Sequence, residues 1–228
     1  MDFITSSLAA SLSLILSWDP DVVHAVWTSL YTSGSAILIS ALFGIPLGLL
    51  VGLRNFRGKR VVITGLNTLM AMPTVVIGLL VYGVISRQGP LGEWGLLFTP
   101  VAMIIGQTVL ATPIVTNYTL AAVVGADKRI VPTALTLGAG TLQACWQLLL
   151  EVRFGIMAAI ITGFGRVIAE VGVAMMLGGN IRGFTRTMTT AIALETSKGE
   201  FAFGLALGII LMAVALLINL LLNFLQHR

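Results

Sequence analysis

The chain has few charged residues, and this shortage excludes a water-soluble protein. Only 10% of its 228 residues are charged, whereas 57% are hydrophobic and the mean hydropathy is +1.01. A soluble domain of this size could not bury so much apolar surface, so the composition indicates an integral membrane protein. The apolar segments are long runs, not short alternating strands, which predicts an all-α, polytopic helical bundle.

Cysteine, histidine and catalytic motifs are also scarce. The single cysteine, Cys145, excludes an intramolecular disulfide and a cysteine-cluster metal site. The two histidines, His24 and His227, lie at opposite ends of the chain, so we expect no metal site within one chain. The sequence contains no GxxxxGK[ST], HExxH or GxSxG motif. We therefore expect no cofactor in this chain and no enzymatic activity of its own.

Five apolar segments are each long enough to cross roughly 30 Å of hydrocarbon. The predicted transmembrane helices are residues 27–53, 61–85, 96–124, 154–177 and 201–225. Residues 1–19 precede them and mix apolar with small polar residues, without Lys or Arg. This pattern favours an interfacial helix on the membrane over a secretory signal, and Asp19 and Pro20 are expected to cap and start the next helix.

The distribution of cations predicts how the chain is oriented. Five spans place the termini on opposite sides of the membrane. With the basic loop 54–60 inside, the inner cations are Arg54, Arg57, Lys59, Arg60, Lys128, Arg129, Arg153 and Arg228. The outer cations are then Arg87, Arg182, Arg186 and Lys198. This inner excess predicts an outside N-terminus and a cytoplasmic C-terminus.

Small residues and prolines mark the first three spans. Gly44, Gly48 and Gly52 recur at every fourth position, which predicts one flat helix face for close packing. Prolines within the spans are expected mainly to shape the helices, and they are Pro46, Pro73 and Pro113.

Residues 125–152, between the third and fourth spans, are not membrane-like. Good helix formers stand on both sides of Gly138-Ala139-Gly140, which predicts two short helices meeting at an angle. The topology places this segment in the cytoplasm. It is either a docking surface for a soluble partner or an ordinary helical connection between spans.

Polar residues near the fourth span are the candidates for a pathway or gate. Arg166 and Glu170 are four residues apart and can pair, either beside a pathway or as a structural ion pair. Residues 178–199 form a Thr- and Arg-rich outer segment, interpreted as an outer gate. Its donors suit a tetrahedral dianion, although a solvated outer loop is the alternative. The candidates are Arg166, Glu170, Asn180, Thr185, Arg186 and Thr187.

Residues 131–151 resemble the cytoplasmic loop motif of permease subunits of ATP-binding-cassette (ABC) importers. That motif runs Glu-Ala-Ala, three residues, Gly, nine residues, Ile, one residue, Leu-Pro. Its glycine falls on Gly138, whereas Pro132 and Glu151 stand in place of its glutamate and proline. The coupling residues that this resemblance implies are Pro132, Ala134, Gly138, Leu148, Leu150 and Glu151.

Residues 163–201 resemble the corresponding stretch of molybdate and tungstate permeases. The shared pattern is Arg-x-x-x-Glu-x-Gly, then Gly-Asn, then Thr-Arg-Thr. The Glu-Val-Gly and Thr-Ser-Lys-Gly-Glu forms found here resemble most the tungstate branch. The resemblance covers the chain after about its first twenty residues.

This resemblance implies one transmembrane permease domain over residues 1–228, with the bundle of a type I ABC importer. It implies a multi-pass plasma-membrane protein that acts as a homodimer, with two cytoplasmic ABC ATPases that bind ATP and Mg²⁺. An extracytoplasmic oxyanion-binding protein would deliver the anion, and nucleic acid is not an expected partner. Tungstate and molybdate are similar in size and charge, so the choice between them stays open. A stand-alone anion channel or secondary carrier is the alternative function.

Overall fold

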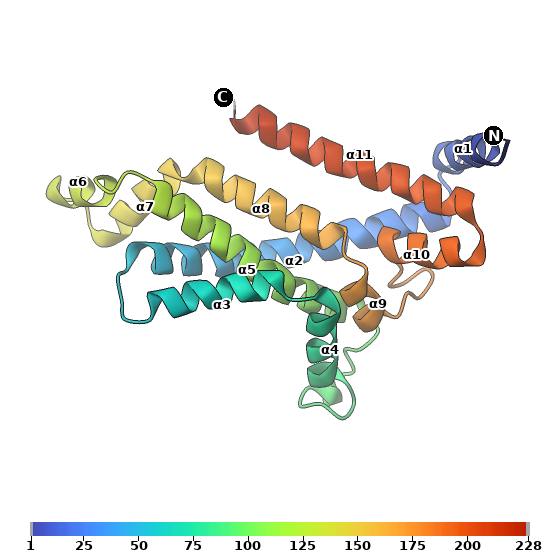
Figure 1. The fold of residues 1–228 in the computed structure, drawn as a ribbon, viewed down its shortest axis with the longest axis horizontal. Coiled ribbons are helices and arrows are strands. Elements are labelled where there is room, and N and C mark those ends of the chain that lie inside the picture. The colour runs from blue at the N-terminus through green and yellow to red at the C-terminus, as the bar shows by residue number, and fades with distance from the viewer. Residues whose placement is uncertain (1, 227–228) are drawn as a thin grey trace.

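The computed structural model describes residues 2–226, with the side chains of residues 5–220 and of Phe224. Met1, His227 and Arg228 lie outside the described residues. Within them the structure contains helices and no strand, so the all-α prediction is confirmed (Figure 1). The elements are α1 (Asp2–Leu16), α2 (Pro20–Leu53), α3 (Lys59–Ala71), α4 (Thr74–Ile85), η1 (Gly92–Trp94), α5 (Pro100–Gly125), α6 (Ile130–Thr136), α7 (Thr141–Glu151), α8 (Arg153–Ile168), α9 (Gly172–Gly178), α10 (Met188–Lys198) and α11 (Phe201–Gln226).

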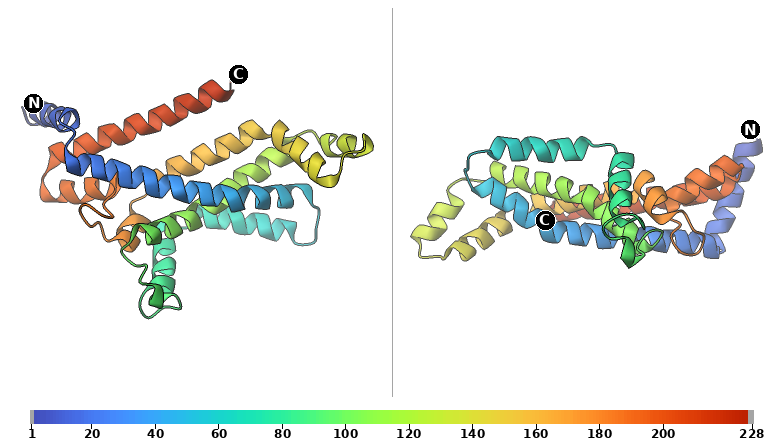
Figure 2. Two further views of the ribbon diagram at one scale, coloured as in Figure 1. Left: turned by 180° about the vertical axis from the view of Figure 1, so that it is seen from behind. Right: turned by 90° about the horizontal axis from the view of Figure 1, so that it is seen from below.

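Helices α2, α5 and α8 run along the length of the molecule and form its centre (Figure 1). α5 packs against both of the others, and α3, α4 and α9 also contact it. The main apolar cluster joins these elements through side chains such as Ile37 of α2, Val115 of α5 and Val167 of α8. α1 packs instead against α11, at the end of the molecule where α2 and α11 both begin (Figure 2).

The glycine face predicted on the first span is confirmed. An ideal Cβ at Gly48 would lie 2.7 Å from the backbone oxygen of Thr116, and one at Gly52 would lie 2.6 Å from Cγ1 of Val123. A Cβ at Gly44 would lie 3.1 Å from Cβ of Val115. The absence of side chains at every fourth position therefore lets α2 lie directly on α5.

The first span begins earlier than the sequence indicated. Its helix starts at Pro20 rather than near residue 27, and the Asp19 cap is confirmed. Oδ1 of Asp19 accepts the backbone N–H groups of Asp21 at 2.9 Å and Val22 at 3.3 Å. These contacts satisfy donors of the first turn that have no partner inside the helix.

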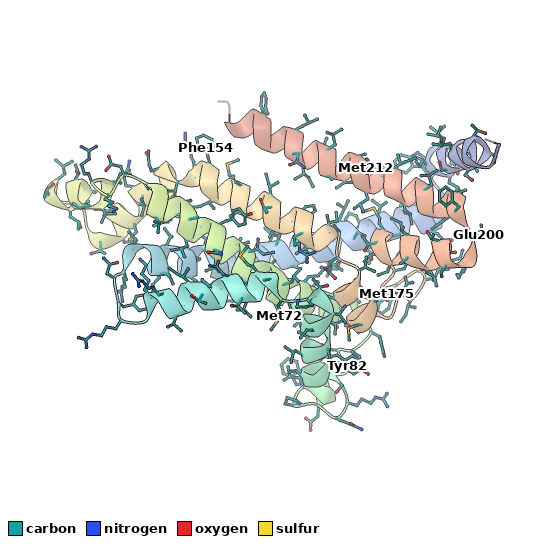
Figure 3. The ribbon with its side chains drawn as sticks, in the orientation of Figure 1. Met72, Tyr82, Phe154, Met175, Glu200 and Met212 are labelled. Carbon is teal, nitrogen blue, oxygen red and sulfur yellow. The ribbon has the colours of Figure 1, made fainter. Side chains whose placement is uncertain are left out.

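The second span, expected as one helix over residues 61–85, is broken. α3 and α4 are bent by 98° at Pro73, which caps α4. Proline lacks a backbone N–H and disfavours a helical conformation at Met72, so the helix can end here. Figure 3 shows Met72 at this bend and Tyr82 on α4, which runs across the long axis. Pro46 and Pro113, by contrast, lie within continuous helices.

The fourth span, expected over residues 154–177, is also divided. α8 ends at Ile168, and α9 resumes at Gly172 after a short break. α7 and α8 are themselves bent by 66°. Among the described residues, three helices are long and apolar enough to cross a membrane, or up to five if each bent pair is one span. The long helices are α2, α5 and residues 201–220 of α11.

Candidate functional sites

The helix pair predicted around the glycine break is present as α6 and α7, at one end of the molecule (Figure 1). Gly138 has φ +90°, a left-handed conformation that glycine adopts without the strain of a side chain. The Gln143 side chain accepts the backbone N–H of Gly140 at 2.9 Å and so satisfies a donor at the start of α7. The turn thus fixes the two helices at an angle to each other.

The residues of the loop motif do not gather at one point. Leu148 is buried against Val123 and Val152, and so anchors α7 to the end of α5. Pro132 lies in the first turn of α6, where proline is tolerated because its missing N–H has no helical partner. Glu151 is exposed at the end of α7. The motif therefore contains one residue that anchors α7 to α5, Leu148, and others that lie at the surface.

That surface is unusually apolar for the end of a molecule. Leu142 of α7 is 86% exposed and Leu137, at the turn, is 81% exposed. Trp146 is also exposed one turn beyond Leu142. A groove of about 590 Å³ lies between α6 and α7. Leu137, Leu142 and Trp146 therefore leave apolar surface uncovered at this end of the molecule.

An ion pair closes the base of this helix pair. The Arg129 guanidinium donates to Asp127, with Nη2 and Oδ2 2.8 Å apart. These side-chain bonds, and a backbone bond from Arg129, lower the pKa of Asp127 to about 2. The carboxylate therefore stays ionised at any physiological pH and holds the chain where it enters α6.

Arg166 and Glu170 do pair, but not within one helix. Nη1 of Arg166 lies 3.4 Å from Oε2 of Glu170, and Glu170 is buried while half of the arginine side chain is exposed. Oε1 of Glu170 accepts the N–H groups of Gly172 at 2.8 Å and Val173 at 3.3 Å. Its backbone oxygen accepts the hydroxyl of Thr189 at 2.9 Å. Glu170 thus joins the α8–α9 break to α10, which favours the structural interpretation.

The outer threonines are also engaged inside the fold. The hydroxyl of Thr185 donates to the carbonyl of Gly178 and accepts the N–H of Ile181 at 3.0 Å. Thr187 caps α10 by accepting the N–H of Thr190 at 3.3 Å. Nδ2 of Asn180 donates to the carbonyl of Thr190, also at 3.3 Å. Thr185 and Thr187 are buried, and their hydroxyls are engaged in folding the outer segment.

The outer arginines have carboxylate partners. Nη1 of Arg186 lies 3.2 Å from Oε1 of Glu195, which also contacts Nζ of Lys198 at 3.1 Å. The Nε of Arg186 has no partner among the described residues, but this atom is itself buried. Arg182 donates its Nε to Oδ1 of Asp21 at 2.8 Å, and its Nη2 contacts Oδ2. This pairing raises the pKa of Arg182.

Sequence reasoning missed Asp21, which stands 161 positions before its partner. Its place just before the first span, on the same predicted side as Arg182, was the available signal. A groove of about 410 Å³ is lined by Asp21, Arg182, Arg186, Glu195, Lys198, Glu200 and Phe203. It holds three acids beside three bases, so the charges of this outer groove are mixed.

The bent and straight apolar helices, with an exposed helix pair at one end, define a polytopic membrane subunit. Residues 44–228 match the family described as binding-protein-dependent transport system inner membrane component. The chain belongs to this family. It is accordingly a multi-pass plasma-membrane permease of an ABC transport system, and the alternatives of a stand-alone channel or a secondary carrier are not favoured.

Three relatives make the comparison more specific. The tungstate uptake system permease protein TupB of Peptoclostridium acidaminophilum is 38% identical over all of both chains. The TupB protein of Campylobacter jejuni is 40% identical over 100% of this chain and 94% of its own. A probable anion ABC transporter permease protein of Haloferax volcanii is 44% identical over 87% and 88% of the two chains.

Solved structures share the fold at low sequence identity. A chain of the bacterial alginate ABC transporter, in complex with an alginate pentasaccharide-bound periplasmic protein, has a TM-score of 0.73 at 20% identity, covering 95% of this chain and 82% of its own. A chain of the inward-facing MetNI methionine ABC transporter has a TM-score of 0.71 at 16% identity, covering 92% and 95%. The predicted fold of a type I ABC importer permease is thus confirmed.

Proposed function

We propose that this chain is the permease subunit of an ATP-driven tungstate importer. The observation that carries the proposal is the identity of 38% over the full length of a tungstate uptake permease. The chain forms the path for the anion and makes no covalent bond to it. Molybdate, a dianion of similar size, is the competing substrate.

In the membrane, five spans are formed by α2, α3 with α4, α5, α7 with α8, and α11. The N-terminus lies outside and the C-terminus in the cytoplasm, because cations concentrate around residues 54–60 and 128–129. α1 lies on the outer membrane surface, with Leu12 and Leu16 exposed toward lipid. This arrangement puts α6 and α7 in the cytoplasm.

Two copies of the chain form a homodimer, and each α6–α7 pair docks on one ABC ATPase. The exposed Leu137, Leu142 and Trp146 support this assignment, because they present apolar surface where the chain leaves the membrane. The ATPase supplies the ATP and Mg²⁺ site that this sequence lacks. Closure of the ATPase pair moves α7, and its anchor at Leu148 transmits that motion to α5.

An extracytoplasmic oxyanion-binding protein delivers the anion at the outer end. The groove of Asp21, Arg182, Glu195 and Lys198 lies there, and its mixed charges suit a docking surface better than an anion site. Residues 178–199 act as an outer gate whose internal hydrogen bonds hold it together as one body.

Transport by the reconstituted complex tests this proposal. Permease, ATPase and binding protein are incorporated in vesicles, and tungstate uptake is measured with and without ATP and with excess molybdate, sulfate or phosphate. We expect uptake that requires ATP and that molybdate reduces more than sulfate does. Uptake that proceeds equally without ATP would refute an ATP-driven importer, and the absence of tungstate uptake would refute the substrate.

A further inference from the structure

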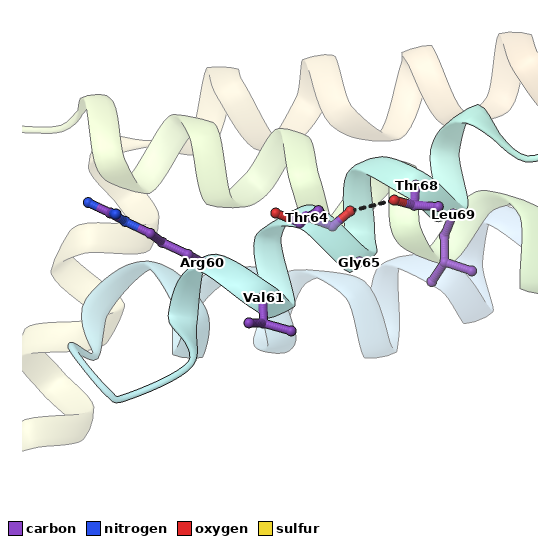
Figure 4. A pocket seen from close by; sticks show the side chains of 6 residues that line it. All are labelled: Arg60, Val61, Thr64, Gly65, Thr68 and Leu69. Carbon is purple, nitrogen blue, oxygen red and sulfur yellow. Dashed lines mark hydrogen bonds between the residues drawn. The ribbon is translucent and has the colours of Figure 1, made fainter.

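One face of α3 is covered by no other part of the chain. None of its thirteen residues, all of which the structure describes, is buried. An open groove of about 600 Å³ runs along this face (Figure 4). Its lining is Arg60, Val61, Thr64, Gly65, Thr68 and Leu69. The half-buried Ile63, Leu66 and Met70 recur at helical spacing on another face, where Met70 contacts α5.

Three polar side chains lie along this face, whose lining is otherwise mainly apolar. Arg60, Thr64 and Thr68 follow one another at helical spacing in the groove. The hydroxyl of Thr68 donates to the carbonyl of Thr64 at 2.9 Å, whereas the Thr64 hydroxyl has no partner among the described residues. Ionisable groups within a membrane span face the interior of a bundle or water, and Arg60 stands in the first turn of α3. We therefore expect this face to line a water-filled space.

The charges around the groove are those that a dianion requires. The sequence has no Asp or Glu between Asp21 and Glu93, and none in α5. Four cations stand at the start of α3 or just before it. Lys59 is engaged, because its Nζ donates to the carbonyl oxygens of Gly52 at 3.1 Å and Arg54 at 3.2 Å. Arg60 pairs with no carboxylate among the described residues and stays available at the inner end of the groove.

A bond between α3 and α5 presents a further donor beside the groove. Nδ2 of Asn117 donates to Oδ1 of Asn67 and lies 3.0 Å from Sδ of Met70. Since Oδ1 of Asn67 is the acceptor, its Nδ2 keeps two N–H groups, and these have no partner among the described residues. Asn67 is exposed, so these donors can reach a ligand.

We propose that this face of α3, from Arg60 through Thr64 to Asn67 and Thr68, lines the inner half of the anion path. The inference rests on the proposed function and on its topology. A tetrahedral oxyanion exchanges hydrogen bonds with successive neutral donors and meets Arg60 at the cytoplasmic end. Neutral donors suit transport because a path must bind its ion weakly, and at several places, for the ion to leave.

Thiol modification of single substitutions tests the path directly. Thr64→Cys and Thr68→Cys are compared with Val62→Cys, which is 40% exposed on α3 but does not line the groove. Vesicles of the complex are treated with anionic and cationic methanethiosulfonate reagents of similar size. Mass spectrometry then measures modification at each cysteine, so that Cys145 can remain in place. We expect rapid modification at positions 64 and 68 and little at position 62.

The sign of the charge and the effect of substrate complete the test. A positive potential of about one kT favours the anionic reagent over the cationic one by roughly fivefold to tenfold. Excess tungstate should slow modification of Thr64→Cys. Equal rates at positions 62 and 64, or faster reaction with the cationic reagent, would overturn the assignment of this face. If ATP-dependent tungstate uptake persists in those vesicles, the proposed importer survives that failure.

Uptake by conservative variants gives an independent measure. Thr64→Val keeps the shape but removes the hydroxyl, and Thr64→Ser restores it. We expect Thr64→Val to lower tungstate uptake per folded complex roughly tenfold, the cost of a hydrogen bond to a charged group. Thr64→Ser should restore it, and Val62→Ala serves as the control. Wild-type uptake by Thr64→Val would show that this hydroxyl does not contact the anion.

Discussion

Adding one methyl group at Gly48 should separate the two central helices. The new Cβ would lie 2.7 Å from the carbonyl oxygen of Thr116 and 2.8 Å from Cβ of Thr119. Carbon atoms pack at about 3.5–4.0 Å, so α2 and α5 must move apart by about 1 Å. Neither obstacle can rotate away, because one is backbone and the other is the branch point of its side chain.

The cost of this separation can be isolated with a second alanine in the same helix. Overpacking of a close contact costs about 1–3 kcal/mol, whereas Gly→Ala in a helix gains up to about 1 kcal/mol. Gly34 also lies in α2, and nothing lies within 4 Å of a Cβ placed there. The propensity gain is common to both variants, so their difference, about 1–3 kcal/mol, measures the contact between α2 and α5.

The measurement is reversible unfolding of the purified permease, in mixed micelles of increasing denaturing detergent, followed by tryptophan fluorescence. We expect Gly34→Ala to be as stable as the natural protein or slightly more stable. Gly48→Ala should unfold at a lower detergent fraction. Equal midpoints for the two variants would refute the close approach of α2 and α5 at this position.

Three further changes test the sites. Glu170→Ala should lower the free energy of unfolding by about 0.5–2 kcal/mol, because it removes the carboxylate that caps α9. Arg166→Ala should lower it little, since the arginine side chain is half exposed. A double variant clearly more stable than Glu170→Ala would instead show that the single change leaves the Arg166 charge without a partner. Gly138→Trp should insert normally but raise the ATP hydrolysed per tungstate transported, and an unchanged ratio would contradict docking at the turn. Arg186→Gln should lower the yield of folded permease, because Glu195 loses a buried partner, while uptake per folded complex at saturating binding protein stays near the natural rate. A slow rate there would instead support the pathway role that the sequence suggested for this arginine.

The features that the sequence predicted well depend on local or periodic signals. Gly138 adopts the positive φ that only the backbone of glycine takes readily, so the break between two helices could be placed without knowing what surrounds it. Asp19 before Pro20 is a cap whose partners lie within the next turn. The spacing of Gly44, Gly48 and Gly52 predicts a packing face on the helix, but it does not indicate that α5 is the helix packed against it.

The two broken spans show where local signals end. Pro46, Pro73 and Pro113 stand in similar apolar runs, yet α2 and α5 continue through theirs and only Pro73 ends a helix. The difference lies in packing, since α4 turns away to contact α9. α4 and α9 are far apart in the sequence, so residues near Pro73 alone could not indicate this contact. The break before Gly172 was not predicted, because the spacing of Arg166 and Glu170 also fits an ion pair on one continuous helix. In the structure the buried Glu170 carboxylate pairs with Arg166 and also accepts the N–H of Gly172 at the start of α9.

Residue type alone did not show that the candidate anion donors are engaged inside the fold. Thr185 and Thr187 are chemically suited to an oxyanion, but each is buried, and a buried hydroxyl needs a partner in the fold itself. Their hydroxyls therefore hold the outer segment together. Donors that can serve a passing ligand must be exposed and left without an internal partner. In this protein that condition directs attention to Thr64 and Asn67 of α3, in a stretch with no carboxylate, and away from the threonine-rich segment that resembles oxyanion permeases.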